Sequence, residues 1–197
     1  MEQKKQKKSK KLPRVITIIV LSLVGLCLLI TGISFISNQT LPEASDTPEQ
    51  LSQLDQTHAE EALNLMSELG DVTWSGLSGN IPLLLWNDEY AFLTNSQEQL
   101  ASWRRLEDAQ VNDLPVYVQE NNADYQAFTE KLSNGQYVGS MATKNKTNIG
   151  FINLFKENLP PVVSKIFPYR LLLLSTDQYI TALVPESFHA YQAENYP

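Results

Sequence analysis

The chain has 197 residues, which is enough for one ordinary domain and an appendage. Its charge is divided unevenly: residues 1–14 hold seven Lys and Arg against one Glu, whereas residues 15–197 hold 8 Lys and Arg against 21 Asp and Glu. So acidic a body cannot bind nucleic acid by neutralising phosphates, and we expect no nucleic-acid partner. The single cysteine, Cys27, excludes an intrachain disulfide and a cysteine-cluster zinc site.

An uncharged apolar run covers residues 15–36 (VITIIVLSLVGLCLLITGISFI). As a helix, these 22 residues would extend about 33 Å, which exceeds the ~30 Å hydrocarbon core of a bilayer. A cleaved signal peptide is the alternative, but its apolar region is about 7–15 residues long and ends at a small-residue cleavage site that this stretch lacks. We therefore predict a transmembrane signal anchor over residues 15–37.

The basic residues 1–14 set the predicted orientation, because Lys and Arg gather on the cytoplasmic side of a membrane helix. We expect this tail to stay in the cytoplasm and to contact anionic inner-leaflet lipid. The predicted localisation is the cell membrane, with a single span. A polar, proline-bearing linker over residues 38–48 then leads to one extracytoplasmic domain over residues 49–197.

The domain opens with a predicted helix. Thr47 is a candidate N-cap, Pro48 occupies the first helical position, Gln50 can close a capping box, and Gly70 is a candidate stop. His58 falls on the apolar stripe of this helix. No second histidine or carboxylate is patterned around it, so packing is favoured over metal ligation for His58.

Residues 81–94 (IPLLLWNDEYAFLT) predict a β-hairpin, with Asn87, Asp88 and Glu89 between its strands. Asp88 and Glu89 could be read as a catalytic carboxylate pair, but neighbours on a turn point apart, and a solvated turn is favoured. The remaining elements predict an α+β domain. They are helices over 97–109, 124–132 and 148–159, strands over 115–119, 136–141 and 169–175, a turn at Asn134-Gly135, and a final helix capped by Thr176.

The chain contains no phosphate-binding G-x-x-x-x-G-K-[ST] loop and no G-x-S-x-G nucleophile motif. It does contain VPESFHAYQ at residues 184–192, whose Glu-Ser-Phe-His spacing matches the last four positions of H-E-x-x-H. In that motif two histidines at i and i+4 hold zinc and the glutamate acts as general base. Glu186 occupies the base position and His189 the second ligand position.

Pro185 stands where the first histidine ligand would be, and it has no lone pair to offer a metal. It also removes the backbone donor to Thr181, at a cost of about 3 kcal/mol inside a helix, so we expect a kink or a helix restart there. An extended zincin signature would place a glycine and a histidine at positions occupied by Gln192 and Asn195. A Glu-x-x-His match alone also arises by chance on solvated helix faces.

Residues 167–194 (FPYRLLLLSTDQYITALVPESFHAYQAE) resemble the strand-plus-helix core of bacterial zincin-like metallopeptidases that carry HE[SA]FHxxQ. Phe188 and Gln192 extend the match beyond four letters, and the resemblance covers about residues 70–197. It implies descent from a zinc-dependent hydrolase. The chain departs from that pattern at Pro185 and ends eight residues after His189, so we expect it to be catalytically inactive or truncated, with no cofactor bound.

The sequence therefore supports two functional hypotheses. The first is a membrane-anchored relative of zinc metallopeptidases, with Glu186 and His189 as degenerate catalytic and ligand positions. The second is a membrane-tethered binding module with no enzymatic ancestry, whose partner would be a peptide, a cell-wall polymer or another membrane protein.

Overall fold

The computed structural model describes residues 11–42, 45–73, 77, 80–123 and 125–196. The chain forms two compact units. The first contains residues 1–41 and 155–171, and the second contains residues 42–154 and 172–197. The prediction of a mixed helix-and-strand protein is confirmed, whereas most of the predicted lipid-binding tail lies outside the described residues.

The first unit is built on helix α1, Lys11–Asn38. Its stretch Arg14–Asn38 is long and apolar enough to cross a membrane, and its most apolar window has no buried residue. A helix that is apolar on all sides needs an apolar environment, which the described residues of this unit do not supply along that window. The same unit holds the last turn of α3 (Lys144–Asn158), the short helix α4 (Pro161–Ile166) and most of the 3-10 helix η1 (Tyr169–Leu172).

The second unit contains a six-stranded sheet in the order β3-β4-β2-β1-β6-β5. Every neighbouring pair is antiparallel except β1 and β6, which run parallel. The strands are β1 Leu83–Trp86, β2 Tyr90–Thr94, β3 Arg104–Val111, β4 Leu114–Glu120, β5 Phe128–Lys131 and β6 Tyr137–Ala142.

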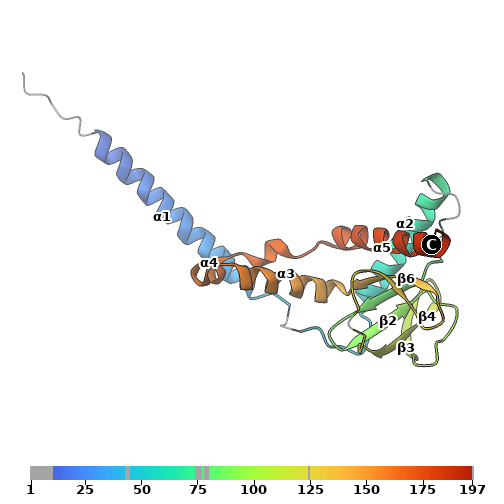
Figure 1. Cartoon of the computed structure of the whole chain (residues 1–197). Coiled ribbons are helices and arrows are strands. Elements are labelled where there is room, and N and C mark those ends of the chain that lie inside the picture. The colour runs from blue at the N-terminus through green and yellow to red at the C-terminus, as the bar shows by residue number, and fades with distance from the viewer. Residues whose placement is uncertain (1–10, 43–44, 74–76, 78–79, 124, 197) are drawn as a thin grey trace, which may run out of the picture. The chain divides into compact units, whose positions relative to one another are not determined.

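Helices α2 (Gln53–Thr73) and α5 (Thr176–Asn195) pack against one face of this sheet, as Figure 1 shows. The core between them includes Leu63 from α2, Leu183 from α5 and Phe92 from β2, all fully buried. A second apolar cluster, including Leu84 and Trp103, covers the opposite face. Because both faces are covered, β1 is apolar along its whole length instead of alternating.

Several predicted elements are confirmed. The hairpin over 81–94 is formed by β1 and β2, and Asn87 organises its turn by accepting the backbone N–H groups of Glu89 and Tyr90. The predicted strand over 115–119 corresponds to β4, and the predicted helix over 148–159 corresponds to α3. The predicted turn at Asn134-Gly135 joins β5 to β6, and β6 is the predicted strand that follows it.

The predicted helix over 97–109 is wrong, because residues 104–111 form strand β3. Asn112 and Asp113 both have positive φ (52° and 62°) and form a tight two-residue connection that folds β3 back along β4. The pairing register shifts between Arg105 and Gln110. This irregularity interrupts the alternation of buried and exposed residues, so the strand period is hidden in the sequence.

The predicted helix over 124–132 is also wrong, although Asp124 itself lies outside the described residues. Residues 128–131 form the edge strand β5, paired with β6 from Phe128 opposite Ser140 to Lys131 opposite Tyr137. Gly135, at φ 91°, allows the turn that brings the two strands together. Pairing across this turn outweighs the local helix preference.

The predicted buried strand over 169–175 is wrong as well. Its first residues form η1, and Leu171 has 81% of its surface exposed. The predicted strand is therefore absent from this segment, whereas the predicted final helix is present as α5.

The predicted helix caps are each displaced. Helix α2 begins at Gln53, and its cap is Ser52, whose Oγ accepts the Asp55 N–H at 3.0 Å, instead of Thr47. Gly70 does not end α2; a Cβ there would lie 2.1 Å from the Leu77 carbonyl oxygen, so only glycine fits beside Leu77. Ser175, one residue before the predicted Thr176, caps α5 in a capping box with Gln178.

Helix α5 lies directly on strand β6 at Gly139. A Cβ at this position would stand 2.9 Å from the Glu186 carbonyl carbon and from the Ser187 nitrogen. These are backbone atoms, which cannot move aside as a flexible side chain would. Gly139 therefore sets the height of α5 above the sheet at the turn that carries Glu186.

We expect Gly139→Ala to destabilise the domain by about 1–3 kcal/mol, because the added methyl must push α5 away from β6. Gly150→Ala is the matched control, since a Cβ at this helical position of α3 meets nothing within 4 Å. It should be neutral or stabilise by up to about 1 kcal/mol. Urea unfolding of the full chain in detergent, followed by tryptophan fluorescence, measures both; equal effects would contradict the assigned contact.

Candidate functional site

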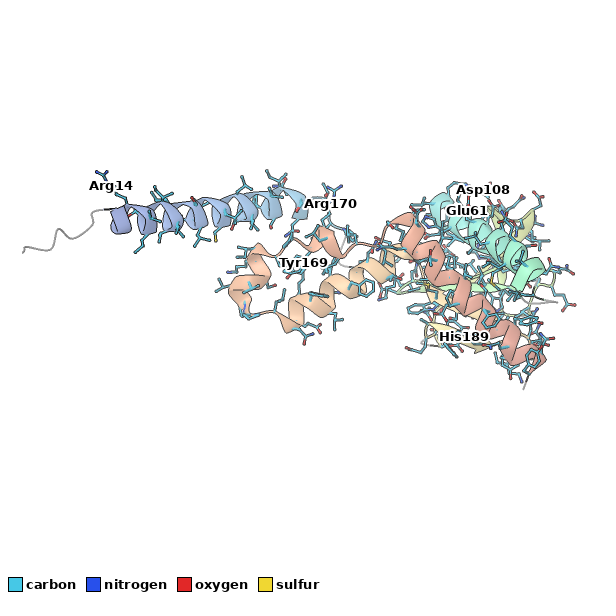
Figure 2. The ribbon with its side chains drawn as sticks, turned by 90° about the horizontal axis from the view of Figure 1, so that it is seen from above. Arg14, Glu61, Asp108, Tyr169, Arg170 and His189 are labelled. Carbon is cyan, nitrogen blue, oxygen red and sulfur yellow. The ribbon has the colours of Figure 1, made fainter. Side chains whose placement is uncertain are left out.

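Helix α5 carries both sequence-predicted site residues. Glu186 and His189 are three residues apart, so they project from neighbouring positions on one side of the helix. The capping box at Ser175 fixes the start of α5, and the contact with Gly139 fixes its middle. Figure 2 shows His189 on this helix beside the strands.

Glu186 is a half-buried carboxylate with an unmet hydrogen-bonding requirement. Its Oε2 atom is sealed from solvent and has no hydrogen-bond partner among the described residues. Burial raises the pKa of Glu186, and the nearby His189 opposes part of that rise. A partly desolvated carboxyl group with a raised pKa is the kind of group that serves as a general acid or base.

The His189 imidazole is held between two neighbours. Its Nδ1 lies 3.2 Å from Gln192 Oε1, one turn further along α5. Its ring centroid lies 4.1 Å from that of Phe128 on β5, with the planes inclined by 32°. Gln192 was singled out in the sequence, whereas Phe128 was missed because nothing local connects residue 128 with residue 189.

Pro185 lies inside a helix that continues through it. Helix α5 runs from Thr176 to Asn195 without a break, so the predicted restart at Pro185 is wrong. The Thr181 carbonyl still lacks the backbone donor that residue 185 would supply. The pyrrolidine ring is exposed, which places it on the outer surface of α5.

The residues present do not fit a zinc site. Such a site needs three protein ligands, and α5 offers His189 and Glu186, with Pro185 contributing none. Within the described ranges, no group of three or more His, Cys, Asp or Glu side chains is arranged to hold a metal ion. The predicted absence of zinc from the native chain remains a prediction.

A groove of about 270 Å³ lies beside the last turns of α5. Its lining includes Pro82, Tyr137 and Tyr191. Neither Glu186 nor His189 lines this groove, so their chemistry is not joined to it.

Comparison of the chain with protein-family models, with curated proteins and with solved structures finds no match in any of the three. The residues and their geometry are therefore the basis for any functional argument.

A second polar cluster, which the sequence did not predict, surrounds the start of α3. Asp46 accepts the Thr143 hydroxyl at 2.5 Å and the Asn145 amide at 3.0 Å. The Asp46 N–H in turn donates to Asp88 at 2.7 Å, and Lys146 pairs with the same Asp88 carboxylate. Asp88 therefore fastens the linker to the sheet and to α3, a role beyond that of a solvated turn residue.

Asp55 brings helix α2 into this cluster. Its carboxylate accepts the Ser52 hydroxyl at 2.6 Å and the Lys144 N–H, at the first residue of α3, at 3.4 Å. A carboxylate is favoured at a helix N-terminus because the backbone N–H groups there carry partial positive charge. Asp46 and Asp55 thus hold together segments that are about ninety residues apart in sequence.

His58 packs beneath this cluster. It is fully buried, as the apolar stripe predicted, and its ring centroid lies 5.3 Å from that of Tyr179. Neither ring nitrogen has a hydrogen-bond partner among the described residues. The prediction that no carboxylate lies near His58 is wrong, because Asp55, one turn earlier on α2, places its Oδ1 atom 3.9 Å from His58 Nδ1. Burial lowers the pKa of His58, Asp55 opposes that change and Lys144 adds to it; burial also raises the pKa of Asp55.

These shifts predict the direction of the pH dependence. Because the folded pKa of His58 lies below the unfolded value of ~6.5, the unfolded chain binds a proton first, and stability falls as pH drops from about 6.5. The loss approaches about 1.4 kcal/mol for each pKa unit of lowering. Asp55 has the opposite effect on stability. Because its folded pKa is raised, its contribution to the free energy of unfolding declines as pH rises from its unfolded pKa toward its folded pKa.

We expect His58→Leu to remove the loss of stability on acidification between pH ~6.5 and the folded pKa, since the buried group can then no longer be protonated. Urea unfolding of parent and variant at a series of pH values gives the difference in slope; the comparison is made above the range in which Asp55 titrates, because His58 lowers the pKa of Asp55. An unchanged slope in the variant would mean that His58 does not titrate against its buried surroundings.

Proposed function

We propose that this chain is a single-pass membrane protein whose extracytoplasmic α+β domain is related to zinc metallopeptidases and has no peptidase activity of its own. Helix α1 and the basic residues before it support the anchor. The letters of the motif and their placement on a helix packed against a sheet support the relationship.

The observation that carries the proposal is the position of Pro185 on α5. It lies four residues before His189, so a histidine at 185 would face the same side of the helix as His189. Glu186, which follows it, is the half-buried carboxylate described above. The arrangement therefore keeps the base and one ligand position of an H-E-x-x-H helix while replacing the other ligand by a residue that cannot bind metal.

The proposed lack of catalysis follows from the small number of metal ligands that α5 offers. A catalytic zinc is held by three protein ligands, and a single histidine one turn from a carboxylate cannot replace them. Glu186 is then a desolvated carboxyl group without a metal-bound water to activate.

One observation favours the alternative of a non-enzymatic binding module. Phe128 lies on the edge strand β5, is 54% exposed, and contacts the His189 ring in a tilted arrangement. Sheet edges accept extended peptides as an added strand, and an exposed aromatic ring beside such an edge would provide a side-chain contact. Under this alternative the resemblance of residues 184–192 to a zinc motif is a coincidence.

Two substitutions at residue 185 test the relationship. Pro185→Ala and Pro185→His both restore a backbone donor to Thr181, and both should stabilise the domain by at most about 3 kcal/mol. Only Pro185→His should create a histidine pair at i and i+4, so only its melting temperature should rise when zinc is added.

Neither substitution should restore peptidase activity. The decisive control is Pro185→His combined with His189→Ala, which should lose the zinc response while keeping the gain in stability. If Pro185→His lowers stability and gains no zinc response, Pro185 is a native structural residue and the binding-module alternative should replace the proposed relationship.

The topology is tested separately with a tag placed before Met1. Protease added to intact spheroplasts should digest the domain after residue 38 and leave the tag with α1, because the basic flank stays inside. Digestion of the tag from outside, or release of a soluble processed domain, would contradict the proposed anchor.

A further inference from the structure

Residues 155–171, here called the juxtamembrane segment, expose apolar side chains that their own fold does not need. Val162 has 75% and Leu171 81% of its surface exposed, and Val163 and Ile166 are also exposed. Val162 and Ile166 are four residues apart on α4 and so lie on one face of that helix. No residue of α4 is buried.

The segment already has an aromatic core of its own. The ring centroids of Phe155 and Phe167 are 5.6 Å apart, and those of Phe167 and Tyr169 are 5.2 Å apart. Tyr169 is buried, and its hydroxyl lies 2.6 Å from Ser164 Oγ. The exposed residues of α4 and Leu171 are therefore left over after the segment has formed its internal contacts.

Hydrogen bonds fasten the segment to the end of α1. The Asn38 amide donates to the Phe167 carbonyl at 2.9 Å and accepts the Tyr169 N–H at 3.1 Å. Arg170 donates to the Thr40 hydroxyl at 3.3 Å, and Figure 2 shows Arg170 beside this end of α1. The apolar run of α1 ends at Ile36, only about 3 Å of helix rise before Asn38.

A groove of about 470 Å³ lies between the two parts of this unit. One wall is α1 from Ile30 to Ser37, and the other contains Pro168, Leu171 and Arg170. The groove thus combines apolar walls with a guanidinium group, which binds phosphate through paired N–H groups.

The charge of the segment differs from that of the rest of the domain. It holds three of the eight Lys and Arg that follow residue 14 (Lys156, Lys165 and Arg170) but only one of the 21 Asp and Glu, Glu157. Long basic side chains can keep their charged ends at the level of the phosphates while their stems lie along apolar surface. The segment therefore matches a phospholipid surface in both apolarity and charge, as interfacial helices do.

We propose that the juxtamembrane segment binds the phospholipid leaflet at which α1 leaves the membrane. Val162, Ile166 and Leu171 enter the boundary between headgroups and acyl chains, and Lys165 and Arg170 contact lipid phosphate. This inference rests on the proposed function in one respect, since α1 must span the bilayer for Asn38 to lie at its surface.

The test uses the full chain with Cys27→Ser and one introduced cysteine labelled with an environment-sensitive fluorophore. Val162→Cys and Leu171→Cys report on the segment, Leu23→Cys on the span, and Asp108→Cys on an exposed position of β3. The chains are reconstituted in phosphatidylcholine–phosphatidylglycerol vesicles. Quenchers are aqueous iodide and lipids brominated either near the headgroup or deep in the acyl chain.

Labels at residues 162 and 171 should show blue-shifted emission, quenching by the shallow brominated lipid and loss of iodide quenching relative to the label at 108. The label at residue 23 should be quenched by the deep brominated lipid. Adding Val162→Asp and Ile166→Asp should make the label at residue 171 accessible to quenching by iodide again. Both positions are exposed, so they can be changed without disturbing the aromatic core.

The outcomes separate the two proposals. If the label at residue 23 is not quenched by the deep lipid, the anchor itself fails. If that label is quenched while those at 162 and 171 respond to iodide as the label at 108 does, the anchor stands and the proposed lipid contact is overturned. Retained protection of the label at 171 in the double-aspartate variant would also overturn it.

Discussion

The close approach of α5 to β6 is the contact on which the candidate site depends. Residue 139 is glycine, and the backbone of Glu186 and Ser187 occupies the space that a side chain there would need. Because α5 lies this low, Leu183 can enter the core shared with α2, and His189 can reach Phe128 on the neighbouring strand. A backbone-to-backbone contact of this kind cannot be relaxed by a change of rotamer, so it fixes the position of the whole helix.

Glu186 lies on the same turn of α5 as this contact. The Glu186 backbone lies against Gly139, and its side-chain Oε2 atom is sealed from solvent without a donor among the described residues. An unpaired, desolvated carboxyl group is costly, and such groups persist most often where chemistry or binding uses them. In this chain the position of the first motif histidine is a proline, so Glu186 has no metal-bound water to act on. That combination is what the proposed descent from a zinc site would leave behind.

The first unit is built in the opposite way to the second. Its apolar side chains are outside, both on α1 and on the juxtamembrane segment, while its aromatic residues form a small core of their own. In water this arrangement would expose a continuous apolar surface beside basic side chains. In a bilayer the same surface becomes favourable, and the end of the apolar run of α1 coincides with the place where Asn38 holds the segment. The polar cluster of Asp46, Asp55 and Asp88 stabilises the other unit at the start of α3, with ordinary hydrogen bonds between distant parts of the chain.

What the sequence determined by itself was the set of features that depend on neighbouring residues. They are the apolar helix, the hairpin around Asn87, the helix that carries Glu186 and His189, and the burial of His58. The chain pairing around β3 and β5 was decided only by the tertiary structure, because a strand is stabilised by its partner strand and not by its own residues. Whether the Leu171 side chain is buried or exposed was likewise decided by the tertiary structure, because its burial requires a sheet or another surface to cover it. The contacts of Phe128 with His189 and of Asp46 with Thr143 join residues 61 and 97 positions apart, a separation at which sequence spacing carries no geometric information.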